Sequence, residues 1–186
     1  MTDFERFLRP LREGMADRAI EHMVVGSTAV SWLATPRVTN DVDIVVRATR
    51  EQMAGLARIL SARDFYFDEQ SAIEAVERRS MVNAIDPASG WKVDFIVLDD
   101  EPFHREEFAR RVEIETPAGS FFVQTPEDLI LSKLRWGQAS QSEKQFRDVV
   151  GVFDIWRPKL DVDYLKKWGD EIGVRELLDE LFDRPA

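Results

Sequence analysis

Three carboxylates lie in apolar, strand-like stretches of this sequence. Asp41 and Asp43 are two residues apart in one β-branched stretch, and Asp94 lies in another, Val93–Leu98. Alternate side chains of a strand point to the same face, so the first two project together, and we expect Asp94 to lie on an adjoining strand. Carboxylate oxygens are ligands that hard divalent ions prefer. The three acids therefore predict a divalent-metal site, with salt bridges to neighbouring Arg or Lys side chains as the alternative.

The acid-x-acid spacing has little weight by itself. With 35 Asp and Glu among 186 residues, it should occur roughly six times by chance. Asp161-Val-Asp163 is another match, which we interpret as the start of a helix. Asp41 and Asp43 differ because their surroundings are apolar, where a charge is costly unless it is paired or bound to a metal.

A phosphate site is predicted where a short buried strand, 22–25, ends at Gly26 and Ser27. Backbone N–H groups at the start of a helix, together with the Ser hydroxyl, can bind phosphate. The alternative is an ordinary strand-to-helix turn in which Ser27 is the N-cap.

Two basic residues have places in the sequence that suggest a function. Lys133 interrupts the apolar helix face of 129–134, where an aliphatic residue would cost less, although a Lys can also extend its ammonium to solvent from such a face. Arg37 precedes the acidic strand, where it can neutralise phosphate or pair with Asp43.

Hydrophobic periodicity predicts a mixed α/β sheet flanked by helices and followed by a C-terminal helical subdomain. We expect a sheet core with an N-terminal helix over 1–125 and helices over 126–186. Thr125 and Pro126 suit a helix start, and Pro10 is expected to kink or split the first helix. Strands are expected at 22–25, 42–46, 65–67, 81–85, 92–98, 112–115 and 121–124. Helices are expected at 3–18, 29–33, 50–62 and 103–110, from Pro126 onward through Leu134, and at 142–156, 161–170 and 173–183; residues 71–79 are expected to form a short helix or a lid.

The charge balance limits the partners. Lys and Arg number 25 against 35 acids, a net charge of -10, which argues against a broad electrostatic grip on nucleic acid. A tRNA acceptor would need a basic patch, and only scattered basic pairs are present. The absence of Cys excludes disulfides and thiolate chemistry. Without an apolar signal region or a membrane-spanning run, we expect a cytoplasmic protein with no membrane partner.

The remaining aromatic and imidazole side chains are interpreted as structural. His104 has no acid-and-nucleophile arrangement near it in the sequence, so a surface or capping role is expected. Burial explains the dispersed tryptophans better than a stacking surface does; they are Trp32, Trp91, Trp136, Trp156 and Trp168.

The spacing of Gly26-Ser27, thirteen further residues and Asp41-Val-Asp43 resembles the signature of the DNA polymerase β-like nucleotidyltransferase superfamily. Asp94 is similar to its third carboxylate. Two longer stretches, Arg37–Asp43 and Pro126–Lys133 with Arg147-Asp148, resemble the bacterial minimal nucleotidyltransferases related to AbiEii-type toxins. The likeness covers residues 20–156.

The resemblance implies a cofactor and a donor: Mg²⁺, as two ions, and an NTP such as ATP. Asp41, Asp43 and Asp94 would bind the metal, and Asp94 would also help to deprotonate the acceptor. Nucleotide contacts would come from Gly26, Ser27, Arg37, Thr39, Lys133 and Asp148. Asp148 has the alternative of pairing with Arg147 or Lys144, and Asn40 departs from the Lys or Asp of many relatives.

Three functions stay open on this sequence. The leading one is transfer of NMP from an NTP to a hydroxyl group of RNA, protein or a small molecule, by a protein that could belong to a toxin–antitoxin pair with a cognate partner. The second is a non-catalytic binding module of the same fold, in which three costly carboxylates would have no evident use. The third is adenylylation of an aminoglycoside, which suits an acidic protein.

Overall fold

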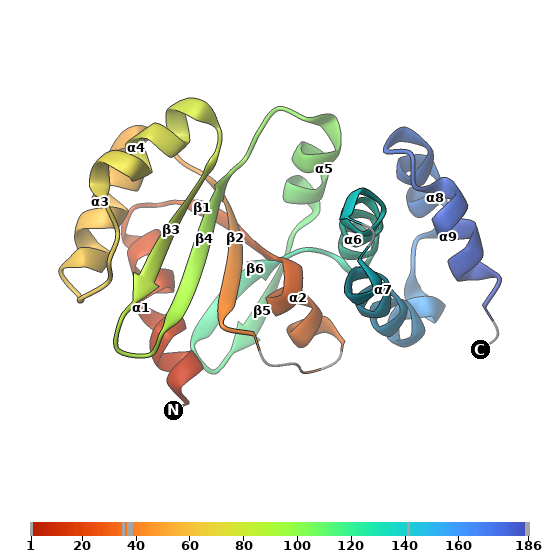
Figure 1. Cartoon of the computed structure of the whole chain (residues 1–186), viewed down its shortest axis with the longest axis horizontal. Helices are drawn as coiled ribbons and strands as arrows, with labels where there is room; N and C mark the ends of the chain where they lie inside the picture. The colour runs from red at the N-terminus through yellow and green to blue at the C-terminus, as the bar shows by residue number, and fades with distance from the viewer. Residues whose placement is uncertain (1, 35, 37–38, 141, 185–186) are drawn as a thin grey trace.

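The computed structural model describes residues 2–34, 36, 39–140 and 142–184. Within them, six strands form one mixed sheet in the order β3-β4-β2-β1-β6-β5 (Figure 1). β2 is parallel to β4, β1 is parallel to β6, and the other neighbouring pairs are antiparallel. The bounds are β1 Glu21–Val25, β2 Asp41–Arg47, β3 Met81–Asp86, β4 Trp91–Val97, β5 Val112–Thr116 and β6 Gly119–Val123.

Helices lie on both sides of this sheet. Figure 1 shows α1, α3 and α4 on one side and α2, α5 and α6 on the other, with α7 to α9 beyond α6. No helix in the described part of the chain has the length and apolar character that crossing a bilayer requires. The bounds are α1 Asp3–Asp17, α2 Gly26–Leu33, α3 Arg50–Ser61, α4 Glu69–Arg78, α5 Pro102–Arg110, α6 Pro126–Ser140, α7 Glu143–Trp156, η1 Arg157–Lys159, α8 Val162–Glu171 and α9 Arg175–Phe182.

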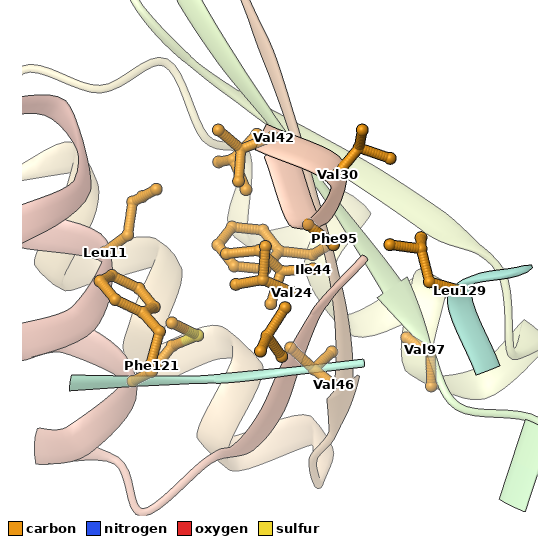
Figure 2. Close-up of a cluster of buried hydrophobic side chains, with 14 of the residues drawn as sticks. Leu11, Val24, Val30, Val42, Ile44, Val46, Phe95, Val97, Phe121 and Leu129 are labelled. Atoms are coloured by element: carbon orange, nitrogen blue, oxygen red, sulfur yellow. The ribbon is translucent and has the colours of Figure 1, made fainter. Parts of the chain in front are cut away.

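Alternate side chains of β2 project to an apolar face of the sheet and to a polar one. Val42, Ile44 and Val46 have no exposed surface and belong to the same buried cluster as Phe95 of β4 and Leu11 of α1 (Figure 2). Because side chains alternate along a strand, the intervening residues of β2 face the opposite side of the sheet. The carboxylates of β2 therefore lie on the face that α1 and α3 do not cover.

The α6 helix begins as its sequence predicts and joins the last helices to the sheet. The hydroxyl of Thr125 accepts a hydrogen bond from the Asp128 amide at 3.2 Å, which satisfies one free donor of the first turn. α6 packs against α2, α7 and α8. The Trp156 indole N–H donates to the Leu33 carbonyl at 2.7 Å and so joins α7 to α2. A domain boundary at residue 125 stays a prediction.

One alternative for Pro10 and one predicted strand were wrong. α1 continues over Asp3–Asp17 with Pro10 inside it, so Pro10 does not split the helix, and the kink stays a prediction; the burial of one apolar side of α1 against the core outweighs one lost hydrogen bond. The predicted strand at 65–67 is reduced to a single bridge between Tyr66 and Ile85, so it adds no strand to the sheet.

Candidate active site

Strands β2 and β4 bring the three predicted carboxylates to one region of the polar face. In the parallel register Asp43 lies opposite Asp94, and Asp41 lies opposite Lys92. Asp41 is exposed, Asp43 is half-buried, and Asp94 is only 7% exposed. The acids thus form a row that runs from solvent into the protein.

Asp43 is held in surroundings that oppose its negative charge. Burial raises its pKa above the usual value, and the neighbouring carboxylates of Asp94 and Asp41 raise it further. The charges of Lys133 and Lys92 act in the opposite direction. Within the described residues, the Asp43 carboxylate forms no ion pair or hydrogen bond. A bound cation would lower the pKa of Asp43 and neutralise this group.

The two oxygens of Asp94 have different surroundings. Oδ2 lies 3.0 Å from the Lys92 ammonium, which is also 3.8 Å from Asp41 Oδ1. Oδ1 is buried and has no hydrogen-bond partner among the described residues. The predicted alternative of salt bridges therefore holds for one side of Asp94, whereas its other oxygen fits a divalent cation that prefers oxygen ligands.

Gly26 is required by the close approach of Asp43. Its φ is +65°, in the left-handed region that glycine adopts at little cost. A Cβ placed on Gly26 would collide with Oδ2 of Asp43. The turn between β1 and α2 can therefore lie against the carboxylate only because residue 26 has no side chain.

Ser27 lies close to its predicted place but does not have the predicted cap role. α2 begins at Gly26, and the N-cap is Val25, which supplies no side-chain hydrogen bond. Ser27 is thus inside the first turn, where the free N–H groups of the helix are found. Its carbonyl accepts a hydrogen bond from the Ser31 hydroxyl, and the residue lines the same cleft as Asp43.

Lys133 is 5% exposed and therefore does not extend into solvent from its helix face. Its ammonium donates to Gln145 Oε1 at 2.8 Å and lies 3.0 Å from Asp148 Oδ2, both on α7. Asp148 thus pairs with Lys133 across the α6–α7 contact, a partner that the sequence analysis did not consider. This pair fixes Lys133 beside the cleft, close enough to Asp43 to oppose its negative charge.

The other two predicted contacts contribute less to the described site. Arg37 lies outside the described residues. The Thr39 hydroxyl donates to the Asp41 carbonyl at 3.1 Å and accepts from the Asp41 amide at 3.3 Å. In this structure Thr39 therefore fixes the start of β2, and it does not line the cleft beside Asp43.

A cleft of about 660 Å³ opens on the polar face of the sheet. One wall contains Gly26, Ser27, Asp43 and Lys133, which are four of the predicted site residues. The end of β4, the following loop and α5 form another part of the lining, which we call the α5 wall. Asp41, Asp94 and Asp148 do not line this cleft but contact its residues or lie beside them.

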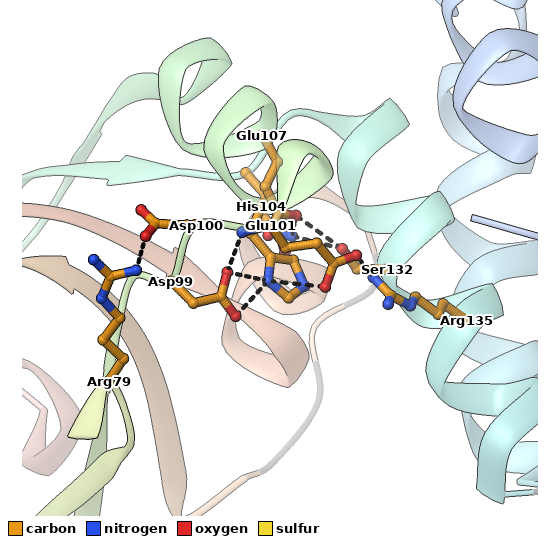
Figure 3. A network of polar contacts seen from close by, with 9 residues as sticks. Arg79, Asp99, Asp100, Glu101, His104, Glu107, Ser132 and Arg135 are labelled. Carbon is orange, nitrogen blue, oxygen red and sulfur yellow. Dashed lines mark hydrogen bonds and ion pairs between the residues drawn. The ribbon is translucent and has the colours of Figure 1, made fainter. Parts of the chain in front are cut away.

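The α5 wall contains titratable residues that the sequence analysis did not select (Figure 3). His104 Nδ1 lies 2.9 Å from Asp99 Oδ1 and 3.6 Å from Glu101, which pairs with Arg135 of α6. The surface or capping role expected for His104 did not include this contact, which forms because the loop before α5 folds Asp99 back onto the half-buried imidazole. The five-residue spacing of Asp99 and His104 gives no regular strand or helix signal.

Glu107 of α5 is a buried acid on the same wall. Its Oε2 accepts hydrogen bonds from Gln124 at 2.8 Å and from Ser132 at 2.9 Å. Burial raises its pKa to about 7, although these two hydrogen bonds and the charge of His104 act against the shift. Glu107 therefore changes its charge near neutral pH.

Trp136 of α6 is a further residue that the sequence interpretation missed. It is 69% exposed and lines the cleft, so the prediction that it is a core residue was wrong. It lies three residues after Lys133, one helical turn along the same helix. Met81, 54% exposed, also lines the cleft from β3. The cleft therefore combines ionic walls with two exposed apolar side chains.

Solved structures with a similar fold were found for this chain. A nucleotidyltransferase-like antigenic protein from Paracoccidioides brasiliensis superposes with a TM-score of 0.54 at 15% identity, over 97% of this chain and 92% of that one. The chain has a nucleotidyltransferase fold. No protein-family model matches the sequence, and neither does any curated protein.

The antibiotic-resistance factor ANT(2'')-Ia shares this nucleotidyltransferase fold. Its structure in complex with adenylyl-2''-tobramycin has a TM-score of 0.57 at 12% identity, over 94% of this chain and 99% of that one. Its solution structure has a TM-score of 0.52 at 11% identity, over 96% of this chain and 92% of that one. The likeness extends over sheet and C-terminal helices together. It leaves the AbiEii-type resemblance a prediction.

The contact between Gly26 and Asp43 leads to a stability prediction. Gly26→Ala should lower the free energy of unfolding by about 3 kcal/mol, because it adds a steric clash to the backbone strain of a positive φ. Gly90→Ala is the matched control, since Gly90 has a φ of +74° but nothing within 4 Å of an added Cβ. Urea unfolding would measure both variants. Equal losses would show that Asp43 does not restrict residue 26.

Glu107 should make stability depend on pH between about 4.5 and 7. Its pKa is raised in the folded state, so the favourable contribution is complete below the unfolded value of 4.5 and is lost as the pH rises through about 7. The difference amounts to about 3 kcal/mol by linkage. Glu107→Gln, which keeps an acceptor for Gln124 and Ser132, should flatten this slope in unfolding experiments across that range. An unchanged slope would mean that Glu107 titrates normally.

Proposed function

We propose that this protein transfers NMP from an NTP to a hydroxyl acceptor with the help of Mg²⁺. The observation that carries the proposal is the convergence of Asp41, Asp43 and Asp94 beside the Gly26–Ser27 turn on the open face of a nucleotidyltransferase fold. Salt bridging alone does not explain this convergence, because Asp94 Oδ1 is buried without a hydrogen-bond partner among the described residues. This orphaned oxygen, together with Asp43, fits a divalent cation.

The residues would divide the work as follows. Asp41, Asp43 and Asp94 would hold Mg²⁺, which when bound stabilises negative charge on the phosphate oxygens. Free N–H groups of the first turn of α2, together with the Ser27 hydroxyl, would bind phosphate. Lys133 would add positive charge from α6, which also lines the cleft. Asp148 and Gln145 of α7 fix the position of its ammonium.

The reaction forms one bond and breaks another. The acceptor oxygen attacks the α-phosphorus of the NTP, and the bond from that phosphorus to the pyrophosphate oxygen breaks. The acceptor loses its proton, which Asp94 would help to remove. Pyrophosphate leaves with the electron pair of the broken bond. Positioning and neutralisation of charge are the main contributions that the chain would make.

Asp43→Asn tests the assignment directly. It keeps the size of the side chain but removes the charge, so transfer of label from radiolabelled NTPs should fall by roughly 100-fold or more. Asp163→Asn is the matched control, because Asp163 belongs to the other acid-x-acid pair and is exposed on α8. Its rate should equal that of the unchanged protein. Equal rates for Asp43→Asn and the unchanged protein would contradict the site.

The same experiment separates catalysis from binding alone. A non-catalytic module would bind Mg-NTP in equilibrium dialysis and transfer label to none of the RNA, protein or small-molecule acceptors. We favour catalysis because three converging carboxylates cost stability without a cation. Membership of a toxin–antitoxin pair stays a prediction from the AbiEii-type resemblance alone.

A small cationic hydroxyl compound is the acceptor that the α5 wall favours. Asp99 and Glu107 add acidic groups to the cleft lining, although Arg135 also lines it, and exposed Trp136 offers an apolar surface to a ring. The fold neighbour ANT(2'')-Ia was solved with an adenylylated aminoglycoside, tobramycin. RNA is disfavoured as an acceptor because its phosphates would meet this acidic wall.

The acceptor prediction is that label from ATP appears on an amine-bearing sugar such as tobramycin and not on neutral glucose. The reason is attraction between ammonium groups and the acidic wall, which should weaken as salt screens the charges. Chromatography of the products would measure transfer, and expression in a susceptible bacterium should raise tolerance of the drug. Equal labelling of glucose, or labelling of RNA only, would contradict a cationic acceptor.

A further inference from the structure

Lys92 lies inside the group of carboxylates. It precedes Asp94 by two residues on β4, so both side chains project from the same face of the sheet. In the parallel register Lys92 is the direct partner of Asp41 on β2. Two strands thus supply four charged side chains to one small area, three negative and one positive.

The Lys92 ammonium contacts one side of this group only. It lies 3.0 Å from Asp94 Oδ2 and 3.8 Å from Asp41 Oδ1, with a third of its side chain exposed. Asp94 Oδ1 and Asp43 have no ion-pair partner among the described residues. The Lys92 ammonium therefore contacts Asp41 and Asp94 Oδ2, whereas Lys133 and Lys92 act on Asp43 only from beyond ion-pair distance.

The net charge of these three carboxylates and the Lys92 ammonium would be neutralised by one divalent ion. Three carboxylates and one ammonium leave two negative charges before a nucleotide binds. A second divalent ion beside Asp41 and Asp94 would meet the Lys92 ammonium, which would repel it at a distance of a few ångströms. Lys133 also acts on Asp43, but it adds no net charge together with Asp148, its ion-pair partner on α7.

We propose that the Lys92 ammonium takes the place of one cation between Asp41 and Asp94, so that the protein without nucleotide binds a single divalent ion through Asp43 and Asp94. This inference rests on the proposed metal site. It adds a positioning residue that holds Asp94 in place by its Oδ2 and limits the number of ions, a role distinct from that of the carboxylates.

Counting bound Mn²⁺ by electron paramagnetic resonance and calorimetry tests the proposal without any nucleotide. We expect one Mn²⁺ per chain for the unchanged protein and for Lys92→Arg, which keeps the charge. Lys92→Met should bind two in the same concentration range, or bind one roughly tenfold more tightly, because a repelling charge is gone. Lys166→Met, a half-exposed Lys on α8, is the matched control and should bind one.

Folding can be checked within the same experiment. Without Lys92 the three carboxylates repel one another, so Lys92→Met should melt several degrees lower than the unchanged protein in EDTA and recover that loss in Mn²⁺. A melting temperature that Mn²⁺ does not raise would contradict the proposal, as would Mn²⁺ binding by Lys92→Met that equals that of the unchanged protein. Two ions on the unchanged protein would also overturn it. If the unchanged protein bound no Mn²⁺, the proposed metal site itself would fail.

Discussion

The close approach of two like-charged side chains, Asp43 and Asp94, determines much of the local sequence. Because β2 and β4 are parallel and in register at these positions, the two carboxylates lie side by side on the polar face. Their neighbours are those that such a pair requires: a residue without a side chain at Gly26, and an ammonium at Lys92. Repulsion between buried carboxylates is tolerated where a cation or an ion pair offsets it. The remaining imbalance is concentrated at Asp43 and at one oxygen of Asp94.

The rest of the fold keeps this part of the sheet partly open to solvent. α1, α3 and α4 bury the apolar face, and that face supplies much of the core around Ile44 and Phe95. The opposite face can therefore leave a cleft between β2, α5 and α6 without losing the main core. A network of Glu107, Gln124 and Ser132 connects α5, the end of β6 and α6 at one wall of the cleft. The position of the cleft is thus a consequence of which strand residues are apolar.

The sequence was sufficient for features that depend on short-range patterns. Alternation along β2 and β4 predicted the carboxylate row, and a charged residue in an apolar helix face identified Lys133. Asp161 caps α8 as expected, since its side chain accepts from the Tyr164 amide. Features made by packing of distant segments were missed: the Lys133–Asp148 pair depends on how α6 meets α7, and the Asp99–His104 contact depends on a loop. Trp136 was assigned to the core from its residue type. That assignment failed because residue type indicates burial only on average.

The low sequence identity to other proteins with the nucleotidyltransferase fold has a physical explanation. Identities of 11% to 15% over more than nine-tenths of the chain mean that this fold needs a pattern of apolar strands and helices and few particular residues. Such a pattern fixes the strand register. The register in turn fixes the positions at which carboxylates meet beside the β1–α2 turn. It fixes the α5 wall only in part, because Phe103 belongs to the core and Glu107 to a buried hydrogen-bond network, whereas Asp99 and His104 are half-buried residues of the cleft lining. In this chain that wall carries Asp99 and His104, so under the proposed function the choice of acceptor would depend on residues that the fold itself leaves undetermined.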